Sequence, residues 1–269
     1  MQNPRRTNGK MTVKARSQVG HFIKLVDNMV EIVEYFSSIQ GEGKFQGKNA
    51  FFIRLGGCNL KCVGFGCSLR SPKTGEMLLG CDTIKAAQSS HFEYEKFDSQ
   101  RLISLLLGLK HKPLIIITGG EPLIYYSDRD LLKFLEYAIS VGFSIQFETN
   151  GTIDVDFAKF PIYKKCTFAV SVKLALSGEP AHKRINKKAL KSLFSNASCF
   201  YKFVTTGEQI DEIKEILALQ NGEVWCMPLA RDQNELEYNA KNVVNLCMEN
   251  GFNYSDRLHI RIWNDLNGV

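Results

Sequence analysis

Four of the eight cysteines in this 269-residue chain lie within one glycine-rich segment: Cys58, Cys62, Cys67 and Cys81. Thiolates are the protein ligands of iron–sulfur clusters, and short spacings allow one loop to wrap the inorganic core. Glycines let the backbone approach such a core closely. The segment contains or adjoins Gly56, Gly57, Gly64, Gly66 and Gly80. It therefore predicts an iron–sulfur cluster held between Cys58 and Cys81.

A four-cysteine zinc site is the alternative for this segment. Zinc sites are usually built from paired C-x2-C knuckles, and no two of these cysteines have that spacing. The spacing favours iron–sulfur and leaves zinc open. Without a secretory signal, a disulfide framework is disfavoured. The other cysteines are expected to be buried small apolar residues. They are Cys166, Cys199, Cys226 and Cys247.

Three further features could bind a small polar molecule. The turn at Gln40–Gly43 offers an amide, a carboxylate and open backbone, which can satisfy the donor–acceptor edge of a pyrimidinone. Arg54 could clamp a carboxylate with two hydrogen bonds. His259 could face the same site. The alternatives are an ordinary glycine turn, a surface ion pair and a histidine packed in the core.

Composition limits the function classes. The net charge is +6, but residues 1–28 carry +5 of it and the other 241 residues only +1. A basic leader or tag of this kind gives no support to nucleic-acid binding. No apolar run is long enough to span a bilayer. We therefore expect a poorly structured leader at 1–28, one catalytic domain at 29–269, no nucleic-acid or membrane partner, and a cytoplasmic location.

The body alternates strand-like and helix-like segments, which predicts a parallel sheet with right-handed crossovers. The units are too few for a complete eight-fold barrel, so the expected fold is α/β, an incomplete TIM-type barrel. The expected strands are Val30–Phe36, Ala50–Leu55, Leu114–Thr118, Ser144–Thr149, Thr167–Val172, Cys199–Val204, Glu223–Met227 and Arg257–Trp263. The expected helices are Asp98–Lys110, Asp128–Val141, Lys187–Phe194, Gln209–Leu219 and Glu235–Asn250.

Chemistry in such barrels lies at the carboxyl ends of the strands. The cysteine segment and three short loops follow strands in this chain. The loops are Gly119–Pro122, Thr149–Gly151 and Ser171–Lys173. We expect all four to meet at one edge of the sheet.

Taken together, these motifs resemble the radical S-adenosylmethionine superfamily. The shared features are the C-x3-C start at Cys58 and Cys62 beside glycine, and Gly119-Gly120-Glu121-Pro122, the GGEP motif. The superfamily pattern is C-x3-C-x2-C, and here the third cysteine comes later. Within it, Ser38-Ile39-Gln40-Gly41-Glu42-Gly43 and Cys81-Asp82-Thr83 resemble the 7-carboxy-7-deazaguanine synthase family. That resemblance favours Cys81 as the third ligand and leaves Cys67 on an inserted loop.

The resemblance implies three groups of site residues. The cluster is a [4Fe–4S] cluster on Cys58, Cys62 and Cys81, with Mg²⁺ at Thr83. S-adenosylmethionine is bound by Gly80, Asp82, Gly120, Glu121, Ser171, Val172 and Lys173. A pterin substrate is bound by Ile39, Gln40, Gly41, Glu42, Arg54, Thr118, His259 and the C-terminal Val269.

The resemblance also implies the reaction. An electron from the cluster cleaves the sulfonium to methionine and a 5′-deoxyadenosyl radical, which abstracts hydrogen from C6 of 6-carboxy-5,6,7,8-tetrahydropterin. Ring contraction and loss of ammonia give 7-carboxy-7-deazaguanine, a precursor in queuosine-type 7-deazapurine biosynthesis. A flavodoxin- or ferredoxin-type reductant and a homodimer are expected. The alternatives are a radical activase or maturase acting on a protein or peptide, and a non-enzymatic zinc module.

The choice of third ligand is testable by substitution. Cys81→Ala is expected to lose the cluster, whereas Cys67→Ala is expected to retain it, because only three thiolates are needed. Iron and acid-labile sulfide content after anaerobic reconstitution measures both variants. The reverse result, with Cys67 required and Cys81 dispensable, would contradict the assignment.

Overall fold

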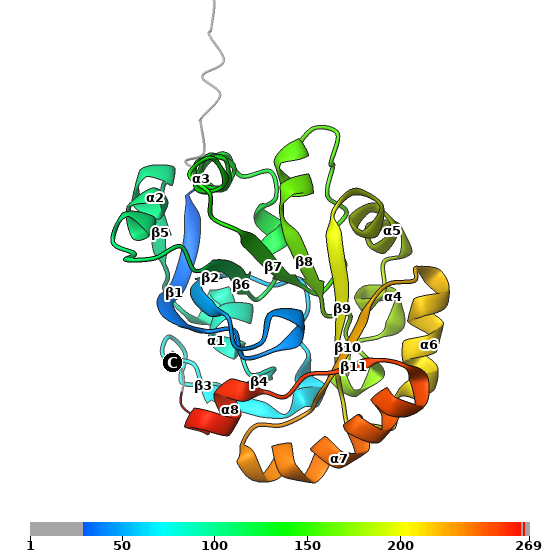
Figure 1. Cartoon of the computed structure of the whole chain (residues 1–269). Coiled ribbons are helices and arrows are strands. Elements are labelled where there is room, and N and C mark those ends of the chain that lie inside the picture. Colours follow the sequence, from blue (N-terminus) through cyan, green and yellow to red (C-terminus); the bar gives the residue numbers. More distant parts are fainter. Residues whose placement is uncertain (1–28, 265, 267–269) are drawn as a thin grey trace, which may run out of the picture.

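The computed structural model describes residues 29–264 and 266 of the chain. One mixed sheet of nine strands runs through it, in the order β11-β10-β9-β8-β7-β6-β2-β1-β5 (Figure 1). The strands are β1 Val30–Ile39, β2 Asn49–Leu55, β5 Glu95–Phe97, β6 Leu114–Gly119, β7 Ile145–Thr149, β8 Thr167–Val170, β9 Ser198–Thr205, β10 Val224–Pro228 and β11 Asn253–Tyr254. A separate antiparallel pair joins β3 Cys67–Arg70 to β4 Met77–Gly80.

From β2 to β11 every neighbouring pair in the large sheet is parallel, and only β1 pairs antiparallel, with both β2 and β5. Among the described residues no pairing joins the edge strands β5 and β11, so the sheet stays open. The predicted α/β fold with a parallel sheet and no closed barrel is confirmed. The order follows the sequence along the parallel strands, as repeated right-handed crossovers produce.

The helices that cross between strands begin where the sequence supplies an N-cap. Asp98, Asp128, Asn186 and Asp232 each accept a backbone N–H of the following turn. Such a cap satisfies amides that have no partner within the helix. The helices are α1 Ile84–Ala87, α2 Ser99–Leu107, α3 Arg129–Ser140, α4 Ala181–Arg184, α5 Lys187–Asn196, α6 Ile210–Leu219, α7 Gln233–Asn250 and α8 Leu258–Trp263.

The two faces of the sheet differ in chemistry. Side chains of alternate residues point to opposite faces of a strand. On β7, Ile145 and Phe147 are buried in the main core between sheet and helices. The residues between and after them, Gln146 and Glu148, therefore point to the opposite face. We call the face that packs against the helices the outer face and the opposite face the inner face. The main core lies on the outer face, so the inner face can carry polar groups.

One strand was predicted wrongly. Arg257–Trp263 alternates polar and apolar residues, which is typical of a half-buried strand, but the structure places helix α8 there. The segment lies beyond the edge strand β11, where Ile260 packs with Ala230 and Leu236. Without a strand to pair with, the backbone forms its own helical hydrogen bonds, for example Arg261 N to Arg257 O at 3.0 Å.

The other expected strands and helices are confirmed, with ends shifted by a few residues. The sequence did not predict the short strand β5, the β3–β4 pair or the short helices α1 and α4. Of the scattered cysteines, Cys166, Cys226 and Cys247 are buried as expected, and Cys199 is only partly buried. The predicted leader at 1–28 lies outside the described residues. Within the described part, no helix combines the length and apolar character that crossing a bilayer requires.

Gly119, at the end of β6, is fixed by a close approach of two strands. Its φ is +145°, and a Cβ there would lie 2.1 Å from the carbonyl oxygen of Leu55 on β2. Gly119→Ala is therefore expected to destabilise the fold by roughly 2–4 kcal/mol, through strain and overpacking. Denaturant unfolding measures the loss. Gly47→Ala is the matched control, with φ +83° and nothing within 4 Å of the added Cβ. It should lose only about 1 kcal/mol, and equal losses in both variants would contradict the argument.

Candidate functional site

The carboxyl ends of the parallel strands collect the loops that carry the predicted chemistry. The loop after β2 holds the first cysteines, and the loops after β6, β7 and β8 hold GGEP, Glu148–Thr152 and Ser171–Lys173. The segment between β11 and α8 lies at the same end. The turn after β1 leads into the amino end of β2 and reaches this site across the inner face of the sheet, where Gln40 bonds Glu148 and Glu42 bonds Lys202. Figure 1 shows α8 close to the β3–β4 pair and to the turn after β1. The four loops predicted to meet do meet.

Neighbouring thiols contribute to the pKa values of the first two cysteines of the loop. The pKa of Cys58 is raised to about 12, mainly by burial, with smaller contributions from Glu121, Cys62 and Cys81. Burial raises the pKa of Cys62 to about 11, again with a contribution from Cys81. Cys67 lies on β3 opposite Gly80, and its pKa is raised by burial, then by Asp82 and Cys81. Cys58, Cys62 and Cys81 thus form one group, and Cys67 is close to Cys81 at its margin.

The donor set fits a cluster better than a single ion. Among the described residues, no three His, Cys, Asp or Glu side chains converge closely enough to hold one metal ion. A zinc site needs such convergence on one point. Cysteines around an iron–sulfur cluster bind separate irons, so they stand farther apart. Three soft thiols in a glycine-rich loop, one buried and two half-buried, therefore suit a cluster.

The GGEP loop lies directly against the cysteine loop. A Cβ on Gly120 would fall 2.2 Å from Gly57 O and 2.6 Å from Cys58 Cβ. The amide of Glu121 donates to the same Gly57 carbonyl at 2.9 Å. Only a glycine at 120 permits this approach. The second glycine of the motif therefore brings its own backbone beside the first cysteine.

Glu121 joins the GGEP loop to the end of β7. It is fully buried and accepts hydrogen bonds from Leu123 N at 3.0 Å, Thr149 Oγ1 at 2.8 Å and Asn150 N at 2.6 Å. Burial raises the pKa of Glu121 to about 6, against the lowering effect of these donors. The carboxylate is thus occupied by the protein itself and shapes the loop around Gly120.

Two residues that the sequence did not single out hold the cysteine loop. Asn59 donates to Thr152 Oγ1 at 2.7 Å and accepts from Asn150 Nδ2 at 2.9 Å. Glu179 accepts from the amides of Lys61 at 2.5 Å and Cys62 at 3.1 Å. Cys62 has a positive φ of 52°, uncommon for a residue with a side chain. These bonds hold the cysteine loop to the loops after β7 and β8.

A buried ion network occupies the opposite side of the site. Glu42, from the turn after β1, accepts from Lys202 Nζ at 2.8 Å and Arg257 Nε at 2.9 Å. Lys202 is 4% exposed and also pairs with Glu148 at 3.2 Å. Burial raises the pKa of Glu42, but the two cations outweigh it and hold that pKa well below its usual range. Glu42 is therefore charged and fixed in orientation.

The network extends in two directions. Gln40 donates to Glu148 Oε1 at 3.0 Å, so both polar residues of the predicted pyrimidinone turn are held by inner-face side chains. Arg257 donates to Asp82 Oδ2 at 3.1 Å, which reaches the residue beside Cys81. The turn and the cysteine segment are thereby neighbours in space.

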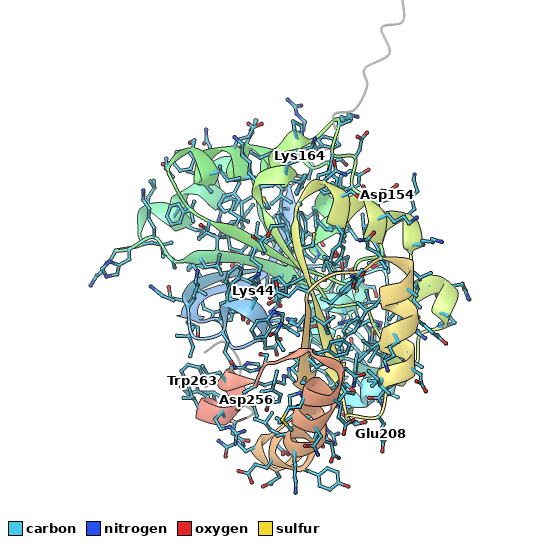
Figure 2. All side chains as sticks on the ribbon, turned by 45° about the vertical axis from the view of Figure 1, so that its right-hand side comes forward. Lys44, Asp154, Lys164, Glu208, Asp256 and Trp263 are labelled. Atoms are coloured by element: carbon cyan, nitrogen blue, oxygen red, sulfur yellow. The ribbon has the colours of Figure 1, made fainter. Side chains whose placement is uncertain are left out.

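The C-terminal segment encloses the turn. Leu258 N donates to Gly41 O at 2.9 Å, and a Cβ on Gly41 would lie 2.4 Å from His259 Nδ1. His259 Nε2 is 3.8 Å from Glu42 Oε1, and burial lowers the pKa of His259. Figure 2 labels Lys44, which follows the turn, and Asp256 and Trp263 on this segment; the contact between the two is made by Gln46 Nε2, which donates to Asp256 O at 2.9 Å. His259 thus lies beside Glu42 rather than in the core.

The remaining predicted residues are placed one by one. Arg54 lies on the inner face but pairs through Nε with Glu34 Oε1 at 2.7 Å. Lys173 reaches Ser171 Oγ at 3.3 Å and opposes the burial-driven rise in the pKa of Cys62, so it faces the cysteine loop. Thr83 Oγ1 lies 3.2 Å from Cys81 Sγ. Thr118 and Val172 are buried at the ends of β6 and β8, while Val269 lies outside the described residues.

Two buried polar atoms lack a partner among the described residues. They are Ser38 Oγ, at the end of β1, and Gln146 Oε1, on β7. A buried polar group without a hydrogen bond costs free energy, and such groups often mark a site completed by water or ligand. Both belong to strands that carry inner-face polar residues, which is consistent with a polar ligand site there.

The residues missed by the sequence analysis left partial signals. Lys202 interrupts an otherwise apolar strand, an arrangement that requires a buried partner. Glu148 and Arg257 stand inside motifs that were recognised but were not assigned a role. Asn59 and Glu179 gave no signal, because their function depends on loops 93 and 117 residues away in sequence.

No protein-family model matches the chain. Among curated proteins it is similar to the 7-carboxy-7-deazaguanine synthase of Halobacterium salinarum, 29% identical over 87% of this chain and 90% of that protein. The 7-carboxy-7-deazaguanine synthase of Pyrobaculum aerophilum is 28% identical over 89% of this chain and 97% of that protein. The crystal structure of QueE from Escherichia coli superposes with a TM-score of 0.60 at 24% sequence identity. The superposition covers 86% of this chain and 95% of that chain. The last comparison supports the same fold.

The ion network gives a stability prediction. Lys202→Met would leave the largely buried Glu148 without a cation and Glu42 with Arg257 alone, and we expect a loss of about 2–4 kcal/mol in the free energy of unfolding. Adding Glu148→Gln to that variant removes one uncompensated charge and should recover part of the loss. Denaturant unfolding of the single and double variants measures both effects. A double variant less stable than Lys202→Met alone would contradict the charge argument.

Proposed function

We propose that this chain, a homologue of the 7-carboxy-7-deazaguanine synthases over most of its length, is itself such an enzyme. It is a lyase that converts 6-carboxy-5,6,7,8-tetrahydropterin to 7-carboxy-7-deazaguanine with release of ammonia, in queuosine-type 7-deazapurine biosynthesis. The motifs in the sequence and the named homologues agree on this reaction. The substrate is a small molecule, as it is for an enzyme of this kind.

The [4Fe–4S] cluster is assigned to Cys58, Cys62 and Cys81. The proximity of Cys81 to both Cys58 and Cys62, seen in its contribution to their raised pKa values, and the close approach of Gly120 to Cys58 support this set. Cys67, opposite Gly80 on the β3–β4 pair, is left out of it. When bound, the cluster supplies the electron that cleaves S-adenosylmethionine. The protein contributes the geometry of the loop, through Asn59 and Glu179.

S-adenosylmethionine is assigned to the loops that surround the cysteines. The residues are Gly80, Asp82, Gly120, Glu121, Ser171, Val172 and Lys173. Gly120 offers backbone beside Cys58, and the Lys173 ammonium faces the cysteine loop. Glu121 is saturated by three donors of the protein. Its role is therefore to hold the GGEP backbone in place for the nucleotide.

The pterin is assigned to the polar inner face, with Ile39, Gln40, Gly41, Glu42, Thr118 and His259 around it and Val269 at the chain end. A 2-aminopyrimidinone edge presents N–H donors and a carbonyl acceptor. The charged, fixed Glu42 is suited to accept from such N–H groups. His259, beside Glu42 and with a lowered pKa, is neutral at pH 7 and can act as donor or acceptor.

Arg54 is assigned to the carboxylate of the substrate. It lies on the inner face near the end of β2, and among the described residues only its Nε is engaged, by Glu34. Its two terminal nitrogens remain for a carboxylate, which suits a planar guanidinium. The ion pair that the sequence offered as the alternative for Arg54 is present, with Glu34. It is compatible with the proposed role, because Glu34 orients the Arg54 side chain.

Three assignments rest on the family resemblance. Mg²⁺ at Thr83 is one, since a hydroxyl is the hard oxygen ligand that this ion prefers. A flavodoxin- or ferredoxin-type reductant and a homodimer are the others. The cytoplasmic location also stays a prediction.

One observation carries the proposal beyond sequence similarity. Arg257 brings together the pyrimidinone turn at Gln40–Gly43 and the Cys81–Asp82 end of the cysteine segment, because it bonds both Glu42 and Asp82. A site that must bring a pterin beside a cluster-bound nucleotide requires this proximity, because radical transfer needs the reacting atoms in contact.

The proposal is tested by anaerobic reconstitution, followed by incubation with dithionite, S-adenosylmethionine, Mg²⁺ and 6-carboxytetrahydropterin. The expected product is 7-carboxy-7-deazaguanine, identified by mass spectrometry. Formation of 5′-deoxyadenosine without deazaguanine would refute the substrate and keep the radical chemistry. Glu42→Gln should raise KM for the pterin by about 10-fold or more, as expected for loss of a charge-assisted hydrogen bond.

A further inference from the structure

Arg257 connects three segments through one buried side chain. Its Nε donates to Glu42 Oε1 at 2.9 Å, a terminal nitrogen donates to Asp82 Oδ2 at 3.1 Å, and the other donates to the carbonyl of Ala230. The side chain is 9% exposed. Every nitrogen of the guanidinium is therefore committed, and the group is held between the turn after β1, the cysteine segment and the loop after β10.

The two carboxylates on Arg257 belong to different parts of the site. Glu42 lies in the turn assigned to the pterin, and Asp82 follows the third proposed cluster ligand and precedes Thr83. A guanidinium is planar and rigid, so its donors keep a fixed mutual geometry. A displacement of one carboxylate therefore changes the hydrogen bond to the other.

Lys202 provides the contrast within the same network. It is as deeply buried as Arg257 and pairs with the same Glu42, but its second partner is Glu148 on β7. Lys202 therefore connects the turn to the sheet and has no bond to the cysteine segment among the described residues. Among the residues that the structure describes, Arg257 is the cation that the structure places on both Glu42 and Asp82.

The backbone strengthens the link at the turn. Leu258, the residue after Arg257, donates its amide to Gly41 O, and Gln46 Nε2 donates to both Gly41 O at 3.0 Å and Asp256 O at 2.9 Å. The turn and the segment that carries Arg257 are therefore fixed to each other on both sides. A movement of the turn is transmitted to the guanidinium.

We infer that Arg257 is a positioning residue that couples the order of the Gln40–Gly43 turn to the order of the Cys81–Thr83 segment. A ligand that fixes Glu42 then also steadies the segment beside the cluster, and the effect is reciprocal, as linkage requires. The identity of the two ligands rests on the proposed function. The coupling itself rests on the contacts of Arg257.

Amide hydrogen exchange of the protein without cluster or nucleotide tests the coupling. For the turn, the reporters are the amides of Gln40 and Gly47, which bond across it at 2.7 and 2.8 Å. For the cysteine segment, they are the amides of Ala86 and Ala87, which both donate to Thr83 O at 2.9 Å. Exchange at each reporter measures the local opening of its segment.

Arg257→Met should raise exchange by about 10-fold or more at both pairs of reporters, which corresponds to about 1.4 kcal/mol of local stability. Lys202→Met should raise it mainly at the turn. Arg261→Met is the control from the same segment, since Arg261 on α8 pairs with Asp256 and Glu237 instead of Glu42 and Asp82, and it should change neither pair. Arg257→Lys, which can bond one carboxylate well, should restore one pair only.

Adding 6-carboxypterin, a stable oxidised analogue of the proposed substrate, tests transmission. In the unaltered chain it should slow exchange at the turn and at Ala86 and Ala87; in Arg257→Met it should act at the turn alone. Equal effects on Ala86 and Ala87 in both proteins would overturn the coupling. Failure of the pterin to slow exchange anywhere would count against the proposed function, while the comparison of ligand-free variants would still decide the coupling.

Discussion

The site depends on one constraint: a carboxylate, Glu42, buried on the inner face with two cations on it. A buried charge is stable only when it is paired and hydrogen-bonded. Lys202 and Arg257 meet that requirement, and each then brings a second carboxylate with it, Glu148 from β7 and Asp82 from the cysteine segment. The charge of Glu42 thus decides where four other side chains lie.

The two-faced sheet makes this arrangement compatible with a stable fold. Its outer face buries large apolar side chains against the helices, among them Phe147, Phe168, Tyr201 and Phe203. That core supplies the stability, since burial of apolar area is the main favourable contribution to folding. The inner face can then carry charged residues at positions where a sheet covered on both sides would require apolar ones.

The loops at the carboxyl edge are held by polar contacts between segments distant in sequence. Glu121 binds the GGEP loop to the end of β7, Asn59 binds the cysteine loop to Thr152, and Glu179 binds the amides around Cys62. Each of these side chains directs its hydrogen bonds to the protein. They hold the backbone of the loops in place, whereas Gln40 and Glu42 are side chains of the polar face that are themselves held by Glu148, Lys202 and Arg257.

The sequence by itself determined the elements with strong local signals. Alternating strand and helix patterns predicted most elements, and the motifs around Cys58, Gln40 and Gly120 predicted the kind of site. The prediction was wrong at α8, because the alternation of Arg257–Trp263 is compatible with a strand. Within the described part of the chain, no strand beyond β11 is available as a partner, and this decides for a helix. The tertiary structure alone decided which residues share the site's charges. Lys202, Glu148 and Asp82 meet through Glu42 and Arg257 because the turn after β1 and the segment after β11 lie against the inner face of strands far apart in sequence, and no local pattern encodes that proximity.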